Sequence, residues 1–357
     1  MSNLNFPVFK TKIDGDSATF NLEDTASRRE YFLHKAGPEI EKLRDFMRDN
    51  TFVAFLLGKK NSGKGTYSKM FTEAVGKEYV NHISMGDVVR KAHKVFEAGG
   101  ADKEALYAWL KDHYRGFMSL DESVDALLGR NTAGLLPTEF VLALIEKEIS
   151  DLGRKSVFID GFPRELDQVS YSLFFRSLMG YRDDPDFFIF IDLPDTIIEE
   201  RMKYRVVCPK CQTPRNTKLL ATKEVGWDND KGEYYLKCDN PDCDCARMSQ
   251  KEGDNLGMDA IRGRLQKDED IMKQLLNLSG APKVYLRNSI PITESGKMVD
   301  DYEITPAYDY ERNEEGKVTV KETPWIVNDD DGTPSHSLLP AAVAVSLIKQ
   351  SAQVLGL

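Results

Sequence analysis

The sequence predicts an α/β fold in which a parallel sheet, covered by helices on both faces, carries a small β-rich insert. Short, almost entirely apolar runs alternate with amphipathic helical stretches, which is typical of strands buried on both faces of a parallel sheet. All five cysteines fall between residues 208 and 245, in a stretch that is also rich in Gly, Asn and Asp. That stretch is therefore expected to form a separate small unit.

The elements follow in order along the chain. The first 50 residues are mixed in composition, and a helix is expected from Gly37 onward. Four apolar runs predict the strands of the sheet, at residues 51–57, 79–84, 156–160 and 186–192. Amphipathic stretches predict helices at residues 138–152, 164–179 and 195–205, with a last strand at 325–327 and a closing helix at 338–355. Residues 289–323 are polar, and the turn residues 313–316 between two β-like runs predict a hairpin.

The charge of the chain is acidic and unevenly distributed. There are 48 Lys and Arg against 58 Asp and Glu, a net charge of −10, which argues against general affinity for nucleic acid or for anionic membranes. Residues 283–331 alone contribute 6 − 12 = −6. The longest apolar stretch, residues 338–348, is shorter than the roughly 20 residues of a membrane span. No secretion signal is evident, and a cytoplasmic location is expected.

Residues 58–66 (GKKNSGKGT) lie between the first apolar run and a helix. Strand, glycine-rich turn and helix bring backbone N–H groups and a helix N-terminus to one point, which suits a polyphosphate. The usual pattern places a hydroxyl directly after the lysine, but here Gly65 follows Lys64 and the hydroxyl arrives at Thr66. Mg²⁺ would then be held mainly by phosphates, water and distant carboxylates. Asn61 is expected in the left-handed conformation. A Gly/Lys-rich surface turn is the alternative.

Further motifs follow in a fixed order, and together they resemble the adenylate kinase family. They are Ile83-Ser84-Met85-Gly86-Asp87 with Arg90, Asp160-Gly161-Phe162-Pro163-Arg164 with Gln168, then Arg201 and Arg205 before the cysteines and Arg264 after them. The resemblance covers about residues 52–284 and, weakly, 325–355. It implies a P-loop fold with a core (51–205) containing an acceptor-binding insert at about 86–137, a zinc lid (206–254), more core (255–288) and a final core strand and helix (324–357). Residues 1–50 and 289–323 lie outside the resemblance and are expected to be an N-terminal extension and an acidic hairpin insert.

The implied reaction is ATP + AMP to 2 ADP, by direct Mg²⁺-dependent in-line phosphoryl transfer. Such a reaction needs charge neutralisation and no protein nucleophile, and arginine suits it because its planar fork binds phosphate bidentately. Arg201 and Arg205 are four residues apart on one predicted helix and therefore lie on one face of it. The alternative to phosphate binding is that this face is simply exposed to solvent. The catalytic candidates are Lys64, Arg164, Arg201, Arg205, Lys251, Arg264 and Asp160. The ATP-binding candidates are Asn61, Ser62, Gly63, Lys64, Gly65, Thr66, Arg201 and Arg205.

The acceptor side is expected to bind AMP, and the base of the acceptor nucleotide stays open. Its candidates are Met85, Arg90, Leu135, Leu136, Pro137, Gly161, Arg164, Gln168, Lys251 and Arg264. Asp87 and Asp160 would order water on Mg²⁺, with helix capping as the alternative for Asp87. Helix-start packing is the alternative for residues 135–137, and a flipped Gln168 amide could face guanine.

Two departures from the family pattern leave the acceptor base open. Met85 stands where the family usually has Thr, and Lys251 stands where it has Arg. Of Arg262 and Arg264, two apart on a helix, only one can enter the site, and the family pattern favours Arg264. Another nucleoside monophosphate kinase is therefore an alternative. An ATP-binding zinc-ribbon module for nucleic acid is a further one, from a different class.

The cysteines form two knuckles that could close a structural zinc site. Cys208 and Cys211 are spaced C-x₂-C, Cys238 and Cys243 are spaced C-x₄-C, and Cys245 is a spare or substitute ligand. Free reduced cysteines are the alternative. The expected cofactors are thus Mg²⁺ with ATP and a structural Zn²⁺ in the lid. The expected partners are ATP and AMP, without nucleic acid or membrane, and the protein is expected to be a monomer.

Overall fold

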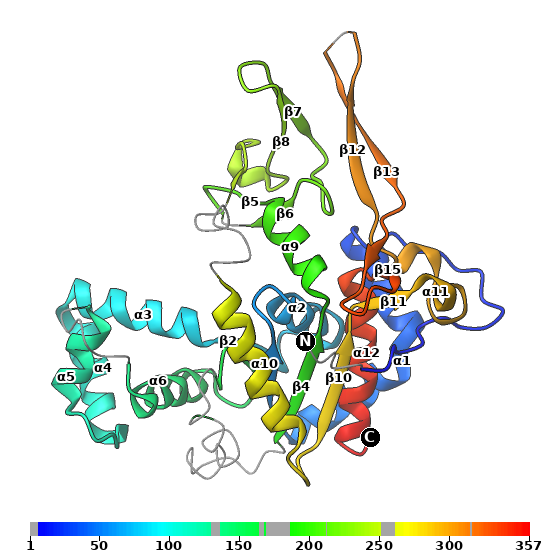
Figure 1. Ribbon diagram of the computed structural model, residues 1–357. Coiled ribbons are helices and arrows are strands. Elements are labelled where there is room, and N and C mark those ends of the chain that lie inside the picture. Colours follow the sequence, from blue (N-terminus) through cyan, green and yellow to red (C-terminus); the bar gives the residue numbers. More distant parts are fainter. Residues whose placement is uncertain are drawn as a thin grey trace.

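Five parallel strands form the central sheet of the protein, in the order β10-β4-β1-β3-β2. The computed structural model shown in Figure 1 describes residues 6–129, 136–163, 168, 186–211, 213–250, 261–314 and 316–357. The strands are β1 Val53–Gly58, β2 Val80–Ser84, β3 Ser156–Asp160, β4 Asp186–Asp192 and β10 Lys283–Arg287. Leu56 of β1 pairs with Asp160 of β3 and with Ile189 of β4, so the carboxyl ends of these strands meet at one edge. The four strands predicted from apolar runs are present.

The fifth strand differs from the expectation. The sequence predicts a last core strand at residues 325–327, but β14 (Val327–Asn328) pairs antiparallel with β15 (Pro334–Ser337), away from the parallel sheet. The core strand is β10, which pairs with β4 at the sheet edge. Its residues alternate between half-buried and buried. An edge strand of this kind lacks the continuous apolar run that predicts the central strands β1, β3 and β4.

Helices cover both faces of this sheet, which confirms the three-layer fold. One face packs against α1 (Thr25–Asp49), α2 (Lys64–Val75) and α12 (Pro340–Val354). The other packs against α3 (Met85–Ala98), α6 (Thr138–Asp151) and α10 (Arg262–Leu276), and α4 (Gly100–His113) and α5 (Leu120–Leu127) extend that side (Figure 1). Residues of β1 alternate between the two hydrophobic clusters, as the period of a strand requires. No helix in the described ranges has the length and apolarity to cross a membrane.

α1 is longer than the sequence predicts. Its backbone leaves the helical region at Ala36 (φ −144°, ψ 26°), two residues before Pro38. The kink follows because proline disfavours helical backbone at the preceding residues. The predicted helix start at Gly37 is therefore the beginning of the second half of α1.

A β-rich unit, as predicted, lies between α9 (Asp195–Lys203) and α10. We call its described residues, between 205 and 250, the cysteine arm. It contains two small antiparallel sheets, β6-β5-β9 and β7-β8. Their bounds are β5 Arg205–Val207, β6 Pro214–Asn216, β7 Val225–Asp228, β8 Glu233–Leu236 and β9 Ser249–Gln250, with a short helix η1 at Pro241–Cys243. Its hydrophobic cluster consists of only Cys208, Leu236, Cys238, Cys243 and Met248 among the buried described residues.

Residues 289–337, which we call the late segment, follow β10. The hairpin β12–β13 occurs where the sequence predicts one, and it stands beside the cysteine arm in Figure 1. The other elements join the sheet β11-β15-β14 or lie next to it. The bounds are β11 Ser289–Pro291, α11 Ile292–Met298, η4 Asp301–Glu303, β12 Ala307–Arg312 and β13 Val318–Thr323, with β14 and β15 as above.

A buried carboxylate joins the late segment to the N-terminal residues. Glu303 has no exposed surface, and it accepts hydrogen bonds from the Thr11 hydroxyl (2.6 Å), the Tyr31 hydroxyl (2.5 Å) and the Asp300 amide (2.7 Å). Lys35 binds Asp300 at 2.6 Å. These donors satisfy a charge that would otherwise be costly to bury.

Candidate active site and cysteine cluster

The phosphate loop, residues 58–66, links β1 to α2 and turns through two left-handed residues. Asn61 has φ 68°, the conformation predicted from the sequence, and Gly63 has φ 100°. A Cβ atom at Gly63 would lie 2.9 Å from the ring of Tyr67. Glycine is thus required there both by the backbone and by the close approach of α2.

Buried polar atoms around this loop lack partners. Within the described ranges, Asn61 Nδ2, Ser62 Oγ and His82 Nε2 are buried and make no hydrogen bond. Each such atom costs about 1–3 kcal/mol when left unpaired. Asn61 Nδ2 and Ser62 Oγ are donors, so a ligand with several acceptor oxygens, such as a phosphate, would satisfy them.

Lys64 and Asp160 face one another at the carboxyl end of the sheet. Lys64 Nζ donates to the carbonyl oxygens of Gly58 (2.8 Å) and Lys59 (3.1 Å) and lies 3.9 Å from Asp160. Asp160 is also 3.9 Å from Nε2 of His82 on β2. Burial lowers the pKa of His82 even though Asp160 opposes this, so the imidazole is neutral at pH 7. His82 is not among the residues predicted from the sequence, where its only signal is a polar side chain inside a strand.

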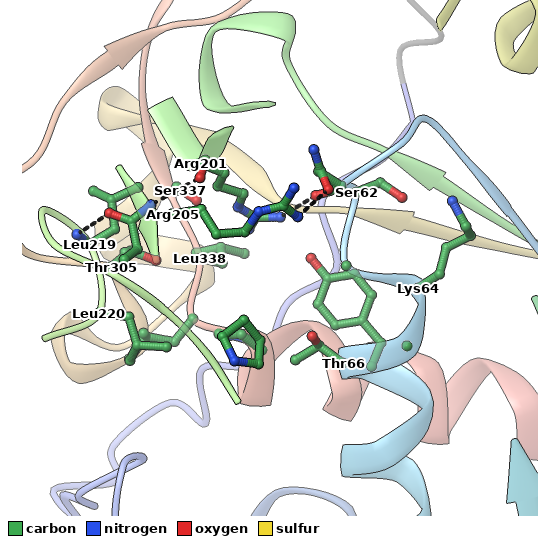
Figure 2. Close-up of a pocket in the computed structure, with 18 of the residues that line it drawn as sticks. Ser62, Lys64, Thr66, Arg201, Arg205, Leu219, Leu220, Thr305, Ser337 and Leu338 are labelled. Atoms are coloured by element: carbon green, nitrogen blue, oxygen red, sulfur yellow. Dashed lines mark hydrogen bonds between the residues drawn. The ribbon is translucent and has the colours of Figure 1, made fainter. Parts of the chain in front are cut away.

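Two arginines reach the phosphate loop, one from α9 and one from the start of the cysteine arm. Arg201 Nη1 donates to the carbonyl oxygen of Asn61 at 3.2 Å, and Arg205 Nη1 donates to Asn61 Oδ1 at 2.7 Å (Figure 2). The prediction that both lie on one helix is wrong. α9 ends at Lys203, and Arg205 is the first residue of β5. Both guanidinium groups nevertheless converge on the same residue.

A cavity of about 440 Å³ opens over the phosphate loop, within the size range of nucleotide-sized ligand sites. All the residues from Asn61 to Thr66 line it, together with Asp160, Arg201 and Arg205. Its far end is formed by side chains of the cysteine arm, of the late segment and of Leu338, which follows that segment (Figure 2). These are Leu219, Leu220, Thr305, Trp325, Ser337 and Leu338, none of which is predicted from the sequence.

A second, much smaller cavity of about 40 Å³ also lies beside Lys64 and Asp160. Its lining includes Gly161 and Arg264, and Lys64 and Asp160 line both cavities. Arg262 does not line it. Of the two arginines in α10, the structure therefore places Arg264 beside Lys64 and Asp160.

Arg90 and Asp87 pair with each other on α3. They form an ion pair three residues apart, with 67% and 72% of their side chains exposed. Burial would raise the pKa of Asp87, but the hydrogen bond and charge of Arg90 lower it overall. In this arrangement Asp87 binds Arg90. In the described part of the chain, Asp87 makes no contact with Asp160.

The remaining acceptor-side residues lie near α6. Met85 is 5% exposed and belongs to the hydrophobic cluster of α3 and α6, against which Leu136 packs, and Pro137 caps the N-terminus of α6. Gln168 is buried, and its Nε2 donates to Thr138 Oγ1 at 3.0 Å. Leu135, Arg164 and Lys251 lie outside the described residues.

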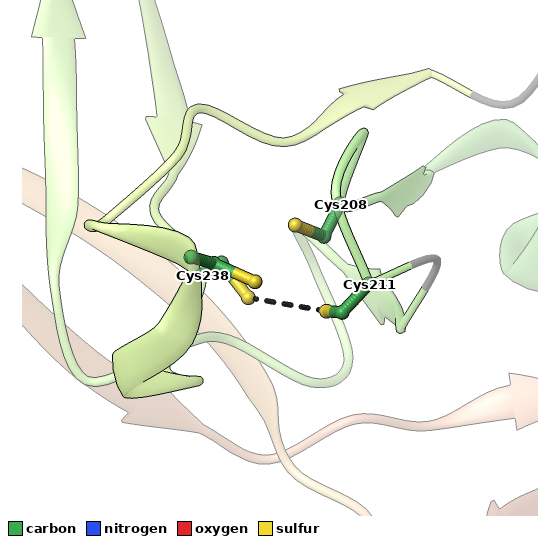
Figure 3. A group of neighbouring side chains, drawn as sticks. Cys208, Cys211 and Cys238 are labelled. Carbon is green, nitrogen blue, oxygen red and sulfur yellow. Dashed lines mark hydrogen bonds between the residues drawn. The ribbon is translucent and has the colours of Figure 1, made fainter.

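Four of the five cysteines converge in the cysteine arm, as predicted. The sulfur atoms of Cys208, Cys211, Cys238 and Cys243 all lie within 4.8 Å of one another, and those of Cys211 and Cys238 are 3.6 Å apart (Figure 3). Tetrahedral Zn²⁺ with Zn–S bonds near 2.3 Å would space its sulfurs by about 3.8 Å. The four thiols therefore fit a metal ion. Cys245 is exposed and outside the group.

The surroundings of the cluster shift the pKa values of its thiols in opposite directions. Hydrogen bonds from the side chain and backbone of Thr213 lower the pKa of Cys211 to about 6. Burial raises the pKa of Cys243 to about 12. One sulfur thus already favours the thiolate form that a metal needs, while another would be deprotonated by the metal itself.

Comparison with known proteins agrees with these features. No family model matches the chain. The chain is 31% identical to the adenylate kinase of Staphylococcus epidermidis over 198 residues, which cover 54% of this chain and 79% of that protein. It is 28% identical to the adenylate kinase of Hydrogenobaculum sp. over 195 residues (52% and 79%) and 29% identical to that of Fervidobacterium nodosum over 192 residues (54% and 75%). The chain thus belongs to the adenylate kinase family and is a nucleoside monophosphate kinase.

Proposed function

We propose that the enzyme transfers the γ-phosphoryl group of Mg·ATP directly to AMP and forms two molecules of ADP. The observation that supports this most is the cavity over the phosphate loop, whose residues Lys64 and Asp160 also line the small cavity that reaches Arg264. A direct transfer needs a donor site and an acceptor site that meet at one point, with cations around it. ATP would occupy the cavity over the phosphate loop, and the acceptor phosphate would approach from the Arg264 side.

The cations account for most of the chemistry. Lys64, Arg201, Arg205 and Arg264 would neutralise the charge that develops on the transferred group and on its leaving oxygen. Mg²⁺ bound to ATP supplies further charge neutralisation at the phosphates. Asp160 would orient water in that region, and neutral His82 beside it adds no competing positive charge. Arg201 and Arg205 both donate hydrogen bonds to Asn61 of the phosphate loop.

We further propose that the cysteine cluster binds a structural Zn²⁺ through Cys208, Cys211, Cys238 and Cys243. The cysteine arm has a small hydrophobic cluster, and a unit of that size usually depends on a metal or disulfide for stability. Asp87 as a second carboxylate for ordering water on Mg²⁺, a monomeric state and a cytoplasmic location remain predictions from the sequence.

A turnover screen tests the proposed reaction. Purified enzyme would be supplied with Mg²⁺ and ATP and with AMP, GMP, CMP, UMP or dTMP, and ADP and the new diphosphate would be followed. We expect a strong preference for AMP. Preference for another base would retain the mechanism and replace AMP as the acceptor. A kinase for another nucleoside monophosphate is the second candidate, because Met85 is buried in the hydrophobic cluster. No transfer to any acceptor by folded, metal-loaded enzyme would refute the proposal.

A further inference from the structure

The hairpin β12–β13 touches one particular loop of the cysteine arm. The Tyr308 amide donates to the carbonyl oxygen of Lys218 at 2.7 Å, and the Tyr310 hydroxyl donates to the carbonyl oxygen of Thr217. These are consecutive residues of the loop that follows β6. The hairpin is therefore bonded to the main chain of this loop, so that a change of side chain in the loop would leave the bonds intact.

The same loop forms the far wall of the cavity over the phosphate loop. Leu219 and Leu220 come next in the chain and line that cavity together with Thr305 and Leu338 (Figure 2). Leu220 is 37% exposed, which is high for leucine, and a ligand in the cavity would cover part of that surface. The position of the loop thus sets the shape of the end of the cavity that is remote from the phosphate loop.

The loop is held from two sides. Inside the arm, Asn216 Oδ1 accepts from the amides of Lys218 and Leu219, both at 2.9 Å. On the other side, Leu219 packs in one buried cluster with Ala307 at the base of the hairpin and with Trp325. Since both of these packing contacts come from the late segment, the arm alone supplies only part of the restraint.

The hairpin itself is anchored at its base and along its length. The Tyr308 hydroxyl donates to Glu23 at 2.8 Å. Further out, the rings of Tyr310 and Tyr234 are 5.4 Å apart, and the Arg312 guanidinium lies 5.8 Å from the ring of Trp227. Burial raises the pKa of Tyr310 to about 12, so its hydroxyl remains a hydrogen-bond donor at physiological pH.

We propose that the hairpin is a positioning element of the nucleotide site, in which Tyr308 and Tyr310 hold residues 217–220 so that Leu219 and Leu220 close the base end of the ATP pocket. The inference rests on the proposed function, because it takes ATP to be the ligand of this cavity. Holding the loop before ATP arrives reduces the ordering that binding requires and therefore favours binding. Tyr310 is a positioning residue and touches no reacting atom.

Tyr310→Phe tests this proposal because it removes only the hydroxyl that donates to Thr217. Tyr234→Phe is the matched control, because Tyr234 belongs to the same ring cluster and its hydroxyl makes no hydrogen bond within the described ranges. We expect Tyr310→Phe to raise the KM for ATP by about twofold to tenfold, the effect of one neutral hydrogen bond. The KM for the acceptor and kcat should change by less than about twofold, a split that general destabilisation would not produce. The control should match wild type.

Hydrogen exchange gives a second measurement that does not depend on turnover. Amides of residues 217–220 should exchange faster in Tyr310→Phe than in wild type or Tyr234→Phe, and more so in Tyr310→Ala/Arg312→Ala. An unchanged ATP KM together with unchanged exchange in both Tyr310 variants would overturn the proposal. A wild-type enzyme without kinase activity would refute the proposed function instead, and the exchange experiment would still decide whether the hairpin holds the loop.

Discussion

Asp192, at the end of β4, provides a test of how charge is balanced near the phosphate loop. Its side chain is 14% exposed and lies 3.2 Å from Arg287, which also binds Asp329 at 2.5 Å. Burial raises the pKa of Asp192 from 3.8 to about 6; Arg287 and Lys59 oppose the rise, and Asp329 and Asp330 add to it. We expect Asp192→Asn to stabilise the protein at neutral pH.

The sign and size follow from linkage. An acid whose pKa rises on folding favours the folded state below its unfolded pKa, and this contribution is lost as pH rises through the folded value. For Asp192 the loss falls between about pH 4 and pH 6, and the pKa difference of 6 − 3.8 = 2.2 corresponds to about 3 kcal/mol. With about 2.1 cal/mol/K of unfolding entropy per residue, a chain of 357 residues would gain roughly 4 °C in Tm at pH 7.5.

Thermal unfolding of wild type and Asp192→Asn between pH 4 and pH 8 measures this effect. The gain in Tm should develop as pH rises from about 4 to about 6, be complete above pH 6 and vanish below pH 4. Asp309→Asn, which removes an exposed carboxylate from β12, should show no such pH dependence. If Asp192→Asn is less stable than wild type by the same amount at every pH, the ion pair with Arg287 outweighs the burial of Asp192, and the reasoning fails.

Three further predictions concern the reaction and the metal. Arg264→Ala should lower kcat by about 10³-fold or more, as for other arginines that stabilise phosphoryl transfer. Arg262→Ala should keep kcat within a few-fold of wild type, and equal losses of kcat in both variants would contradict the assignment. Cys243→Ser should lose zinc by metal analysis and melt at lower temperature, while Cys245→Ser should keep both, and metal-free wild type after careful purification would argue against the site. Gln168→Ala should relax the preference among acceptor bases more than it slows the best substrate, and an unchanged preference in the turnover screen would assign base reading to other residues.

The parts of the fold that the sequence predicts depend on local patterns. The phosphate loop is recognisable because residues 58–66 follow one another, and the backbone turns at Asn61 and Gly63 as their residue types favour. The cysteine cluster is likewise set by two short knuckles. The three central strands β1, β3 and β4 are predicted because both of their faces are buried, and this criterion misses β10, which alternates between half-buried and buried residues at the sheet edge.

The residues that were missed depend on tertiary contacts. Arg205 has helical spacing from Arg201, but the chain leaves α9 at Tyr204, where pairing of β5 with β6 and β9 competes with the helix. Thr305 and Trp325 reach the cavity only because the late segment folds back over the carboxyl end of the sheet. No pattern near either residue indicates that, since the contact joins positions about 100 residues from the cysteine arm.

The buried carboxylate of Glu303 makes the N-terminal residues and the late segment one cooperative unit. Its donors come from residues 11, 31 and 300, so neither piece satisfies the charge alone. Shortening the chain from its start would remove the Thr11 hydroxyl and leave the carboxylate underpaired in a dry environment, at a cost of about 1–3 kcal/mol or more. Deleting either the N-terminal residues or the late segment would therefore destabilise the other. A shortened form of this enzyme would have to lack both and would need new contacts for the side of α1 that the deletion exposes.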